Sequence, residues 1–206
     1  MCQEQQTSAD VQETALAELD KNILLILLKD RSTGKNILWA TDDYKDLGIG
    51  FAADDEITLP AITGANGNLI KPRALKSKEE QGARTRNMAE VFTPLWICNK
   101  QNNLADNAWF GRENVFNTEN GTDWQATEGK IAFPSEKGAD GWIAYIGSKR
   151  LEITCGEAPY LASRYDTMTG EIVPLEKRIG LLDRKLRVIN ERTRNFKDRE
   201  RAKKRW

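Results

Sequence analysis

The sequence predicts an α/β protein with an N-terminal β-hairpin appendage, a domain that combines short strands with helices, and a long amphipathic basic helix at its C-terminal end. Three observations lead to this prediction. Aliphatic segments on both sides of a polar, glycine-containing loop indicate the hairpin. Two short strand-like segments, the second ending at a glycine, indicate a strand that leads into a helix. Apolar residues spaced three and four positions apart indicate the final helix.

Composition limits the size and the surroundings of this fold. The 206 residues are 39% apolar and include six tryptophans, enough for one domain with an appendage or for two small domains. The net charge is zero, but its distribution is uneven. Residues 1–70 carry five basic against twelve acidic side chains, whereas residues 171–206 carry thirteen against six. This asymmetry indicates a nucleic-acid-binding face or an interaction tail at the basic end.

Several classes of protein are disfavoured by the same composition. There is no histidine, and Cys2, Cys98 and Cys155 lie far apart, so we expect neither a metal site nor histidine-based catalysis. The first twenty residues do not have the pattern of a signal peptide. The aliphatic run at residues 24–28 is much shorter than the roughly 20 residues that cross a bilayer. We expect a cytoplasmic protein with reduced thiols.

Residues 1–70 form the predicted acidic appendage. A helix is expected over residues 9–20, capped by Thr7 or Ser8. Strands are expected at Asn22–Lys29 and Asn36–Thr41, joined by a loop whose Gly34 supplies a positive φ. Residues 42–69 have the composition of loops and short strands. Residues 71–88 are basic and nearly free of aliphatic side chains, which predicts a linker before a domain at residues 89–206.

The dipeptide Thr93-Pro94 predicts the start of a helix that runs to about Ala108. The threonine hydroxyl is expected to cap the first turn, and proline suits the first helical position because it needs no hydrogen-bond acceptor there. The positive N-terminal end of the helix would suit a ligand carboxylate beside Phe92. A capped helix without any ligand is the alternative interpretation.

Further along the chain, residues 109–141 are compatible with short strands or an insertion. Ile143–Ile146 and Leu151–Thr154 have the composition of strands, and the second ends at Cys155-Gly156. A glycine at the end of a strand lets the backbone approach a cofactor closely, because it has no Cβ. A helix is expected to begin at Pro159.

Two of these segments resemble a known family when they are taken together. Ala89-Glu90-Val91-Phe92-Thr93-Pro94 precedes Glu152-Ile153-Thr154-Cys155-Gly156-Glu157-Ala158-Pro159-Tyr160-Leu161. In this order they resemble the two S-adenosylmethionine-contacting motifs of amino-group (N6-adenine) DNA methyltransferases, the modification subunits of restriction-modification systems. The family pattern Asp/Glu-x-x-Cys-Gly-x-Gly-x-x-Leu is matched except at Ala158, which replaces the second glycine. The resemblance extends from Leu24-Leu25 to Glu191.

The resemblance implies a fold and a cofactor site. The fold would be the opening part of a Rossmann-like S-adenosylmethionine-dependent domain, incomplete unless its sheet is extended by a partner chain or by self-association. The residues around the cofactor would be Phe92, Thr93, Pro94, Glu152, Cys155 and Gly156. Binding is expected to be weak, because no residue for the ribose side of the cofactor transfers from the family.

Catalysis is the function that the resemblance does not supply. The family transfers methyl groups with an Asn/Asp-Pro-Pro-Tyr/Phe tetrapeptide, and the sequence contains no Pro-Pro pair. We therefore expect no catalytic residue here, and no methyl transfer without a downstream or partner segment. The alternative is a non-catalytic DNA-binding or regulatory protein, such as one of phage origin, that uses this fold as a scaffold.

The C-terminal helix is the strongest single prediction of secondary structure. Its apolar stripe comprises Ile179, Leu182, Leu186, Ile189, Thr193 and Phe196. The other positions carry the basic residues Arg178, Arg184, Lys185, Arg187, Arg192, Arg194, Lys197 and Arg199. These basic side chains are expected to form either a solvated face or a surface that contacts DNA phosphates. The tryptophans are expected to pack in the core.

Overall fold

The computed structural model describes residues 9–153 and 156–205, without the side chain of Met88. The chain forms two compact units, Asp10–Leu75 and the described residues from Lys76 onward together with Ala9. The division falls within the segment predicted as a linker. The structure combines helices with a small two-stranded antiparallel sheet, and in this broad sense it is α/β. None of the described helices is both long and apolar enough to cross a membrane.

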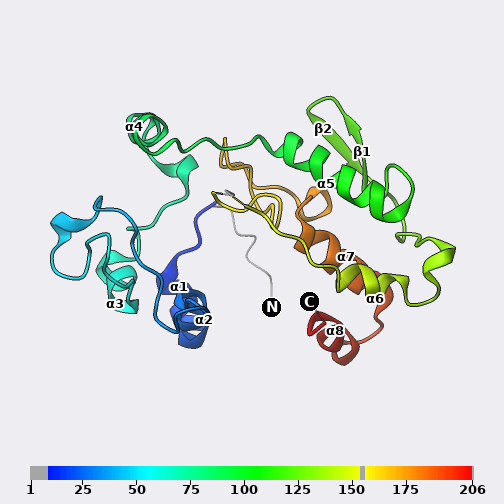
Figure 1. The fold of residues 1–206 in the computed structure, drawn as a ribbon, viewed down its shortest axis with the longest axis horizontal. Coiled ribbons are helices and arrows are strands. Elements are labelled where there is room, and N and C mark those ends of the chain that lie inside the picture. Colours follow the sequence, from blue (N-terminus) through cyan, green and yellow to red (C-terminus); the bar gives the residue numbers. More distant parts are fainter. Residues whose placement is uncertain (1–8, 154–155, 206) are drawn as a thin grey trace. The chain divides into compact units, whose positions relative to one another are not determined.

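The unit at residues 10–75 is built from short helices (Figure 1). They are α1 (Glu13–Leu19), α2 (Lys21–Leu28), α3 (Leu59–Ile62) and the 3-10 turns η1 (Lys45–Leu47), η2 (Gly64–Asn66) and η3 (Arg73–Leu75). Its core consists of Leu28, Trp39, Ile57, Ala61 and Ile62. The Trp39 ring lies against Tyr44 and Phe51, with centroid distances of 4.8 and 5.5 Å. Trp39 thus provides the aromatic surface against which these loop residues pack.

The predicted strand at residues 22–29 is wrong, because this segment is helix α2. The Asp20 side chain caps the helix by accepting a hydrogen bond from the Asn22 backbone N–H at 2.9 Å. Leucine favours helices, and an unbroken aliphatic run has no alternation that would select a strand. Leu24 and Leu28, one turn apart, are buried, whereas the residues between them are largely exposed.

Part of the predicted hairpin is nevertheless present as a reversal of the chain. Lys29 and Asn36 form an isolated antiparallel bridge around the polar loop, where Gly34 has a φ of +73°. Residues 36–41 make only isolated bridges and form no strand. Helix α1 begins at Glu13 rather than near residue 9, after the N-cap Gln12. The proposed caps Thr7 and Ser8 lie outside the described residues.

The second unit contains the longer elements (Figure 1). In chain order they are α4 (Lys78–Met88), α5 (Leu95–Phe110), β1 (Asn117–Asn120), β2 (Asp123–Ala126), η4 (Ser135–Lys137), α6 (Gly141–Ile146), η5 (Leu175–Lys177), α7 (Leu181–Arg192) and α8 (Phe196–Lys203). Helix α4 occupies part of the predicted linker. Its Ser77 and Glu80 form a capping box, with side-chain-to-backbone distances of 3.2 and 2.7 Å.

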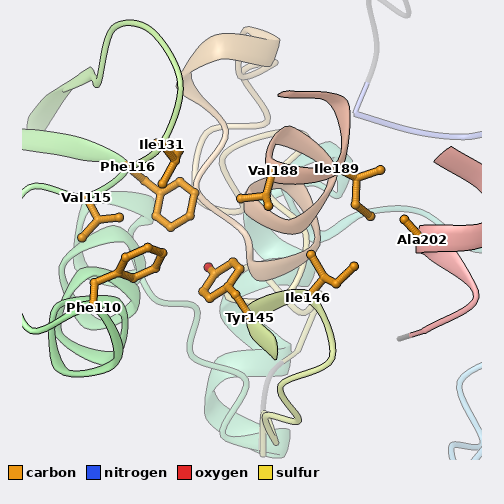
Figure 2. Packing of buried hydrophobic residues seen from close by; sticks show 9 residues of the cluster. All are labelled: Phe110, Val115, Phe116, Ile131, Tyr145, Ile146, Val188, Ile189 and Ala202. Atoms are coloured by element: carbon orange, nitrogen blue, oxygen red, sulfur yellow. The ribbon is translucent and has the colours of Figure 1, made fainter. Parts of the chain in front are cut away.

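An aromatic and aliphatic cluster forms the main core of this unit (Figure 2). Its members come from the end of α5, the segment before β1, the loop after β2, α6, α7 and α8: Phe110, Val115, Phe116, Ile131, Tyr145, Ile146, Val188, Ile189 and Ala202. The rings of Phe110, Phe116 and Tyr145 lie 5.3 to 5.9 Å apart by their centroids. Edge-on and offset ring contacts of this kind add to the free energy gained by burial.

Several predicted elements of this unit are different in the structure. Ile143–Ile146 is part of helix α6, in which Gly141, Tyr145 and Ile146 are buried. Residues 151–153 form no strand, and residues 159–161 form a turn rather than a helix start. Thr154 lies outside the described residues. Among the described residues the sheet consists of β1 and β2 alone, paired from Asn117↔Ala126 to Asn120↔Asp123.

The predicted C-terminal helix is divided into α7 and α8. The Thr193 hydroxyl donates to the Ile189 carbonyl at 2.7 Å, and the Asn195 side chain caps α8 by accepting from the Asp198 N–H at 2.9 Å. Local side-chain bonds of this type compete with helix continuation. Phe196, predicted on the buried stripe, is therefore 73% exposed.

Candidate cofactor site

Helix α5 begins where the sequence predicted, but its N-terminus is built differently. Pro94 is the N-cap residue, and no side chain caps the first turn, so the predicted Thr93 cap is wrong. Thr93 contributes its carbonyl oxygen instead, which accepts from Cys98 Sγ at 3.8 Å and from Thr167 Oγ1 at 3.5 Å. Burial raises the pKa of the Cys98 thiol to about 11, so this cysteine is an unreactive core residue.

The two motifs that predicted a cofactor site meet in the structure. Gly156 has a φ of +50°, and a Cβ built on it would lie 3.0 Å from Cε1 of the Phe92 ring. Phe92 itself is 8% exposed. Only glycine combines this backbone conformation with so close an approach without strain. Segments that are more than sixty positions apart in the sequence are therefore in contact at Phe92 and Gly156.

Glu152, the acidic residue of the second motif, has one of its oxygens unsatisfied. Its Oε1 accepts a hydrogen bond from the Tyr160 backbone N–H at 3.2 Å. Its Oε2 is buried and has no hydrogen-bond partner among the described residues. Burial raises the pKa of this carboxyl group above its ordinary value. Cys155, the neighbouring predicted site residue, lies outside the described residues.

A pocket of about 400 Å³ lies between α5 and the segment that contains Glu152. It is lined by Gln101, Asn102 and Ala105 of α5, by residues 150–153, and by Tyr160, Leu161 and Leu181. Glu152 is the predicted site residue among these lining residues. Phe92, Thr93, Pro94 and Gly156 do not line the pocket, and of these four Phe92 and Gly156 contact each other. The pocket is within the size range of small-molecule sites.

Arg150 contributes a second unsatisfied charged group to the same pocket. Its Nη2 binds Asp106 Oδ1 at 2.5 Å, whereas its Nη1 is buried and has no partner within the described parts of the chain. The pocket wall therefore carries a spare N–H donor and a spare carboxylate acceptor. Both atoms are buried, so a ligand with a carboxylate and an ammonium group would pair with them only after the side chains that line the pocket move. Sequence reasoning missed Arg150, because a lone arginine before an aliphatic residue carries no pattern.

Beneath the pocket, α5 and α7 are joined by a buried polar network. Arg184 donates from Nη1 to Asp106 Oδ2 at 2.6 Å and from Nη2 to the side-chain oxygens of Asn99 and Asn103 at 2.9 and 2.8 Å. Tyr145 donates from its hydroxyl to Asp106 Oδ1 at 3.1 Å, and burial near this carboxylate raises the tyrosine pKa well above its ordinary value. The network fixes one pocket wall.

This network corrects the prediction for the basic face of the C-terminal helix. Arg184 and Lys185 are 2% and 5% exposed rather than solvated. Arg184 is buried against α5, which buries Asn99, Asn102, Asn103 and Asp106, whereas Lys185 Nζ donates to the Ser148 carbonyl at 2.6 Å. These polar residues of α5 recur at helical spacing, which is the pattern in the sequence that indicates a common buried face. Leu104, on another side of α5, is 63% exposed.

Exposed basic side chains concentrate instead at and beyond the end of α7. They are Arg192, Arg194, Lys197, Arg201, Lys204 and Arg205. In the described parts of the chain, no group of three or more cysteine, histidine, aspartate and glutamate side chains is arranged to hold a metal ion. Comparisons of the chain with protein-family models, curated proteins and solved structures found no match.

Proposed function

We propose that this chain binds S-adenosylmethionine as part of a restriction-modification-related DNA adenine methyltransferase. The observation that carries the proposal is the contact between Phe92 and Gly156, which joins the two motifs that resemble the cofactor motifs of this family. Two motifs that bind one cofactor must lie close together in the folded chain, and these two motifs are in contact. The pocket next to Glu152 provides room for a ligand.

The charged atoms of the pocket suit the amino-acid end of this cofactor. In the proposed mode, the methionine ammonium binds Glu152 Oε2 and the carboxylate binds Arg150 Nη1, two of the five buried side-chain atoms that have no partner within residues 9–153 and 156–205. Each is the complement of one ligand charge, and charge-assisted hydrogen bonds contribute about 1.5–3 kcal/mol. The chain itself supplies no recognisable group for the ribose, which favours weak binding.

The proposed fold is the opening part of a Rossmann-like domain. Residues 150–153 would then be its first strand, paired with strands from a downstream segment, a partner chain or a second copy. Leu151 and Ile153 are 82% and 71% exposed on either side of Glu152. This alternation is typical of a strand with one face available for packing. Such pairing would bury apolar surface and complete the pocket.

Methyl transfer is proposed to need that additional segment. An adenine methyltransferase must polarise a flipped-out amine, and the sequence has no Pro-Pro tetrapeptide to do so. The purified chain alone is expected to incorporate no labelled methyl group into DNA. The exposed basic residues at and beyond the end of α7 would contribute sequence-independent contacts to DNA phosphates. The same basic surface favours a second candidate, a non-catalytic DNA-binding protein.

Titration calorimetry with S-adenosylmethionine tests the proposal. We expect wild-type binding toward about the millimolar range, and at least a tenfold loss for Gly156→Val, whose side chain would collide with the Phe92 ring. Gly129→Val is the matched control, since Gly129 also has a positive φ of 71°, but a Cβ added there would have no atom within 4 Å. Equal binding of S-adenosylmethionine by both variants would show that Gly156 is not part of the cofactor site.

A second pair of measurements separates the enzyme subunit from the DNA-binding scaffold. If the wild type binds duplex DNA but not S-adenosylmethionine, the non-catalytic function is supported and the cofactor site is rejected. If it binds the cofactor, addition of a segment containing the tetrapeptide is expected to restore methyl transfer. Binding of S-adenosylmethionine in the nanomolar range would contradict the proposal that the cofactor site is incomplete.

A further inference from the structure

A separate hollow lies beside the N-terminal end of α5, where the β1–β2 turn and residues 166–177 approach that helix. Its volume is about 270 Å³. Aromatic and aliphatic side chains form much of its lining: Leu95, Trp96, Trp124, Ile172, Val173 and Pro174. None of these residues lines the candidate cofactor pocket. We call this second cavity the tryptophan hollow.

We propose that the tryptophan hollow binds a quaternary ammonium group, the head group that choline shares with a trimethylated lysine side chain. The hollow is smaller than the roughly 300–1,000 Å³ of sites for drug-sized molecules. It therefore suits a group of about the size of one side chain. This binding is independent of the proposed methyltransferase function.

Two tryptophans give the hollow its aromatic character. Trp96 is the second residue of α5 and is 37% exposed. Trp124 is 8% exposed and is held in place by a hydrogen bond from its Nε1 to the Lys177 carbonyl at 2.8 Å. The face of an indole ring attracts a cation electrostatically, and tryptophan is the most effective side chain for this purpose. A cation with apolar methyl groups would contact the aliphatic lining as well.

Carboxylates outnumber cations around the tryptophan hollow. Asp123, Asp166 and Glu171 line it, whereas Lys177 is the single cation among its described lining residues. Lys177 pairs with Asp123 at 2.9 Å, and hydrogen bonding from Lys177 lowers the pKa of this carboxyl group. Asp166 and Glu171 remain as excess negative charge. An anionic ligand is therefore disfavoured and a cationic one is favoured.

The hydrogen bonds of these carboxylates favour a cation that has no N–H donor. Asp166 Oδ1 accepts from the backbone N–H groups of Met168 and Thr169 at 2.7 and 3.0 Å. Both oxygens of Asp123 are bonded to Lys177. The two carboxylates thus supply charge more than open acceptors. A primary ammonium or a guanidinium group has several N–H donors to satisfy, whereas a quaternary ammonium needs only negative charge and apolar contact.

Titration of the whole chain with choline, followed by calorimetry or ligand-observed NMR, tests this inference. Trp96→Leu is expected to weaken choline binding about tenfold, because leucine keeps apolar contact but has no ring face. Phe196→Leu is the matched control, since Phe196 is an aromatic residue of α8 that is 73% exposed and does not line the hollow. Equal choline affinities of these two variants would overturn the inference.

The contribution of charge has its own test. The neutral analogue of choline in which carbon replaces the nitrogen is expected to bind the wild type roughly tenfold more weakly than choline. Glu171→Gln should weaken choline binding roughly threefold. Glu176→Gln is the matched control, because Glu176 is also exposed but does not line the hollow. Equal binding of choline and its neutral analogue would contradict recognition of a cation.

Two further measurements identify the source of the ammonium group and separate this site from the candidate cofactor pocket. Displacement of choline by a trimethyllysine peptide, but not by the same peptide with unmodified lysine, identifies a protein side chain; no displacement by either identifies a free quaternary ammonium compound. Choline has neither an adenine nor a carboxylate, and Glu152→Gln in the cofactor pocket should leave its binding unchanged. Absence of choline binding at millimolar concentration would overturn the inference.

Discussion

The two units of this protein stabilise their interiors in different ways. The core at residues 10–75 is apolar, and the main polar bond of its central tryptophan is from Trp39 Nε1 to the Gly50 carbonyl at 3.0 Å. The interior of the second unit combines an aromatic cluster with the buried ion pair of Asp106 and Arg184. Apolar packing tolerates rearrangement as long as volume is kept, whereas a buried charge network requires each partner in place. We therefore infer that the second unit is the more narrowly specified of the two.

The largest expected effect comes from removing the shared carboxylate of the polar network. Asp106→Ala leaves Arg184 buried without its counter-charge and should destabilise the second unit by about 3–5 kcal/mol. Hydrogen exchange measured by mass spectrometry should show lost protection in α5 and α7 and no change at residues 10–75. Asp123→Ala, which removes an exposed pair with Lys177, is the control and should have little effect. Equal hydrogen-exchange protection of α5 and α7 in both variants would contradict the stabilising role of the polar network.

A comparable loss confined to the other unit is expected for Trp39→Ala. Trp39 is 7% exposed and contacts both Tyr44 and Phe51, so its truncation should cost about 3 kcal/mol. Protection should fall at residues 10–75 and remain unchanged in α5 and α7. Leu27→Ala on α2, where the side chain is 63% exposed, is the control. Loss of protection in both units would show that they do not unfold independently.

Two glycines allow the packing of the second unit to be tested with opposite signs. A Cβ at Gly180 would lie 2.6 Å from the Leu161 carbonyl oxygen and 2.7 Å from Ala162 Cα, so Gly180→Ala should destabilise by about 1–3 kcal/mol. At Gly82 in α4, the nearest atom is an arginine side-chain nitrogen at 3.4 Å. Gly82→Ala should stabilise that helix by about 0.5–1 kcal/mol. Thermal unfolding midpoints that shift in the same direction would contradict this packing.

Helix α4 provides a case in which local sequence decides stability. Ser77→Ala removes one half of the capping box and should destabilise the helix by about 1 kcal/mol. Ser77→Gly should cost only a few tenths of that amount, because glycine is tolerated at the N-cap. Exchange protection in peptides from residues 78–88 measures both effects. An alanine variant as stable as the wild type would show that the box contributes nothing.

The smallest expected effect concerns the pH dependence of stability at the candidate cofactor site. Burial raises the pKa of Glu152 above 4.5 in the folded chain, so the folded state holds this proton more tightly than the unfolded state. Its contribution is therefore most favourable at low pH and is lost as the pH rises through the folded pKa. Glu152→Gln should flatten this part of the stability profile, measured as unfolding midpoints from about pH 4 to 7. An unchanged slope would contradict the burial of this carboxyl group.

Some parts of the candidate site could be predicted from local sequence. Pro94 marks the beginning of α5 because proline suits a helix N-terminus, and Gly156, a candidate for a close approach because it has no Cβ, contacts Phe92 with a positive φ. Glu152 lines a pocket as a motif residue would. Arg150 could not be predicted, because its role depends on Asp106, which lies 44 positions earlier and reaches it only through folding.

The sequence alone determined the features that depend on short-range chemistry. These are the N-terminal end of α5, the chain reversal at Gly34 and the absence of a Pro-Pro tetrapeptide. Tertiary structure decided whether residues 22–29 and 143–146 became strands or helices, because short aliphatic runs fit either state and burial selects between them. It also decided which face of α7 is buried. Arginine is hydrophilic by itself, but Arg184 is buried because α5 presents a carboxylate and two amides to it.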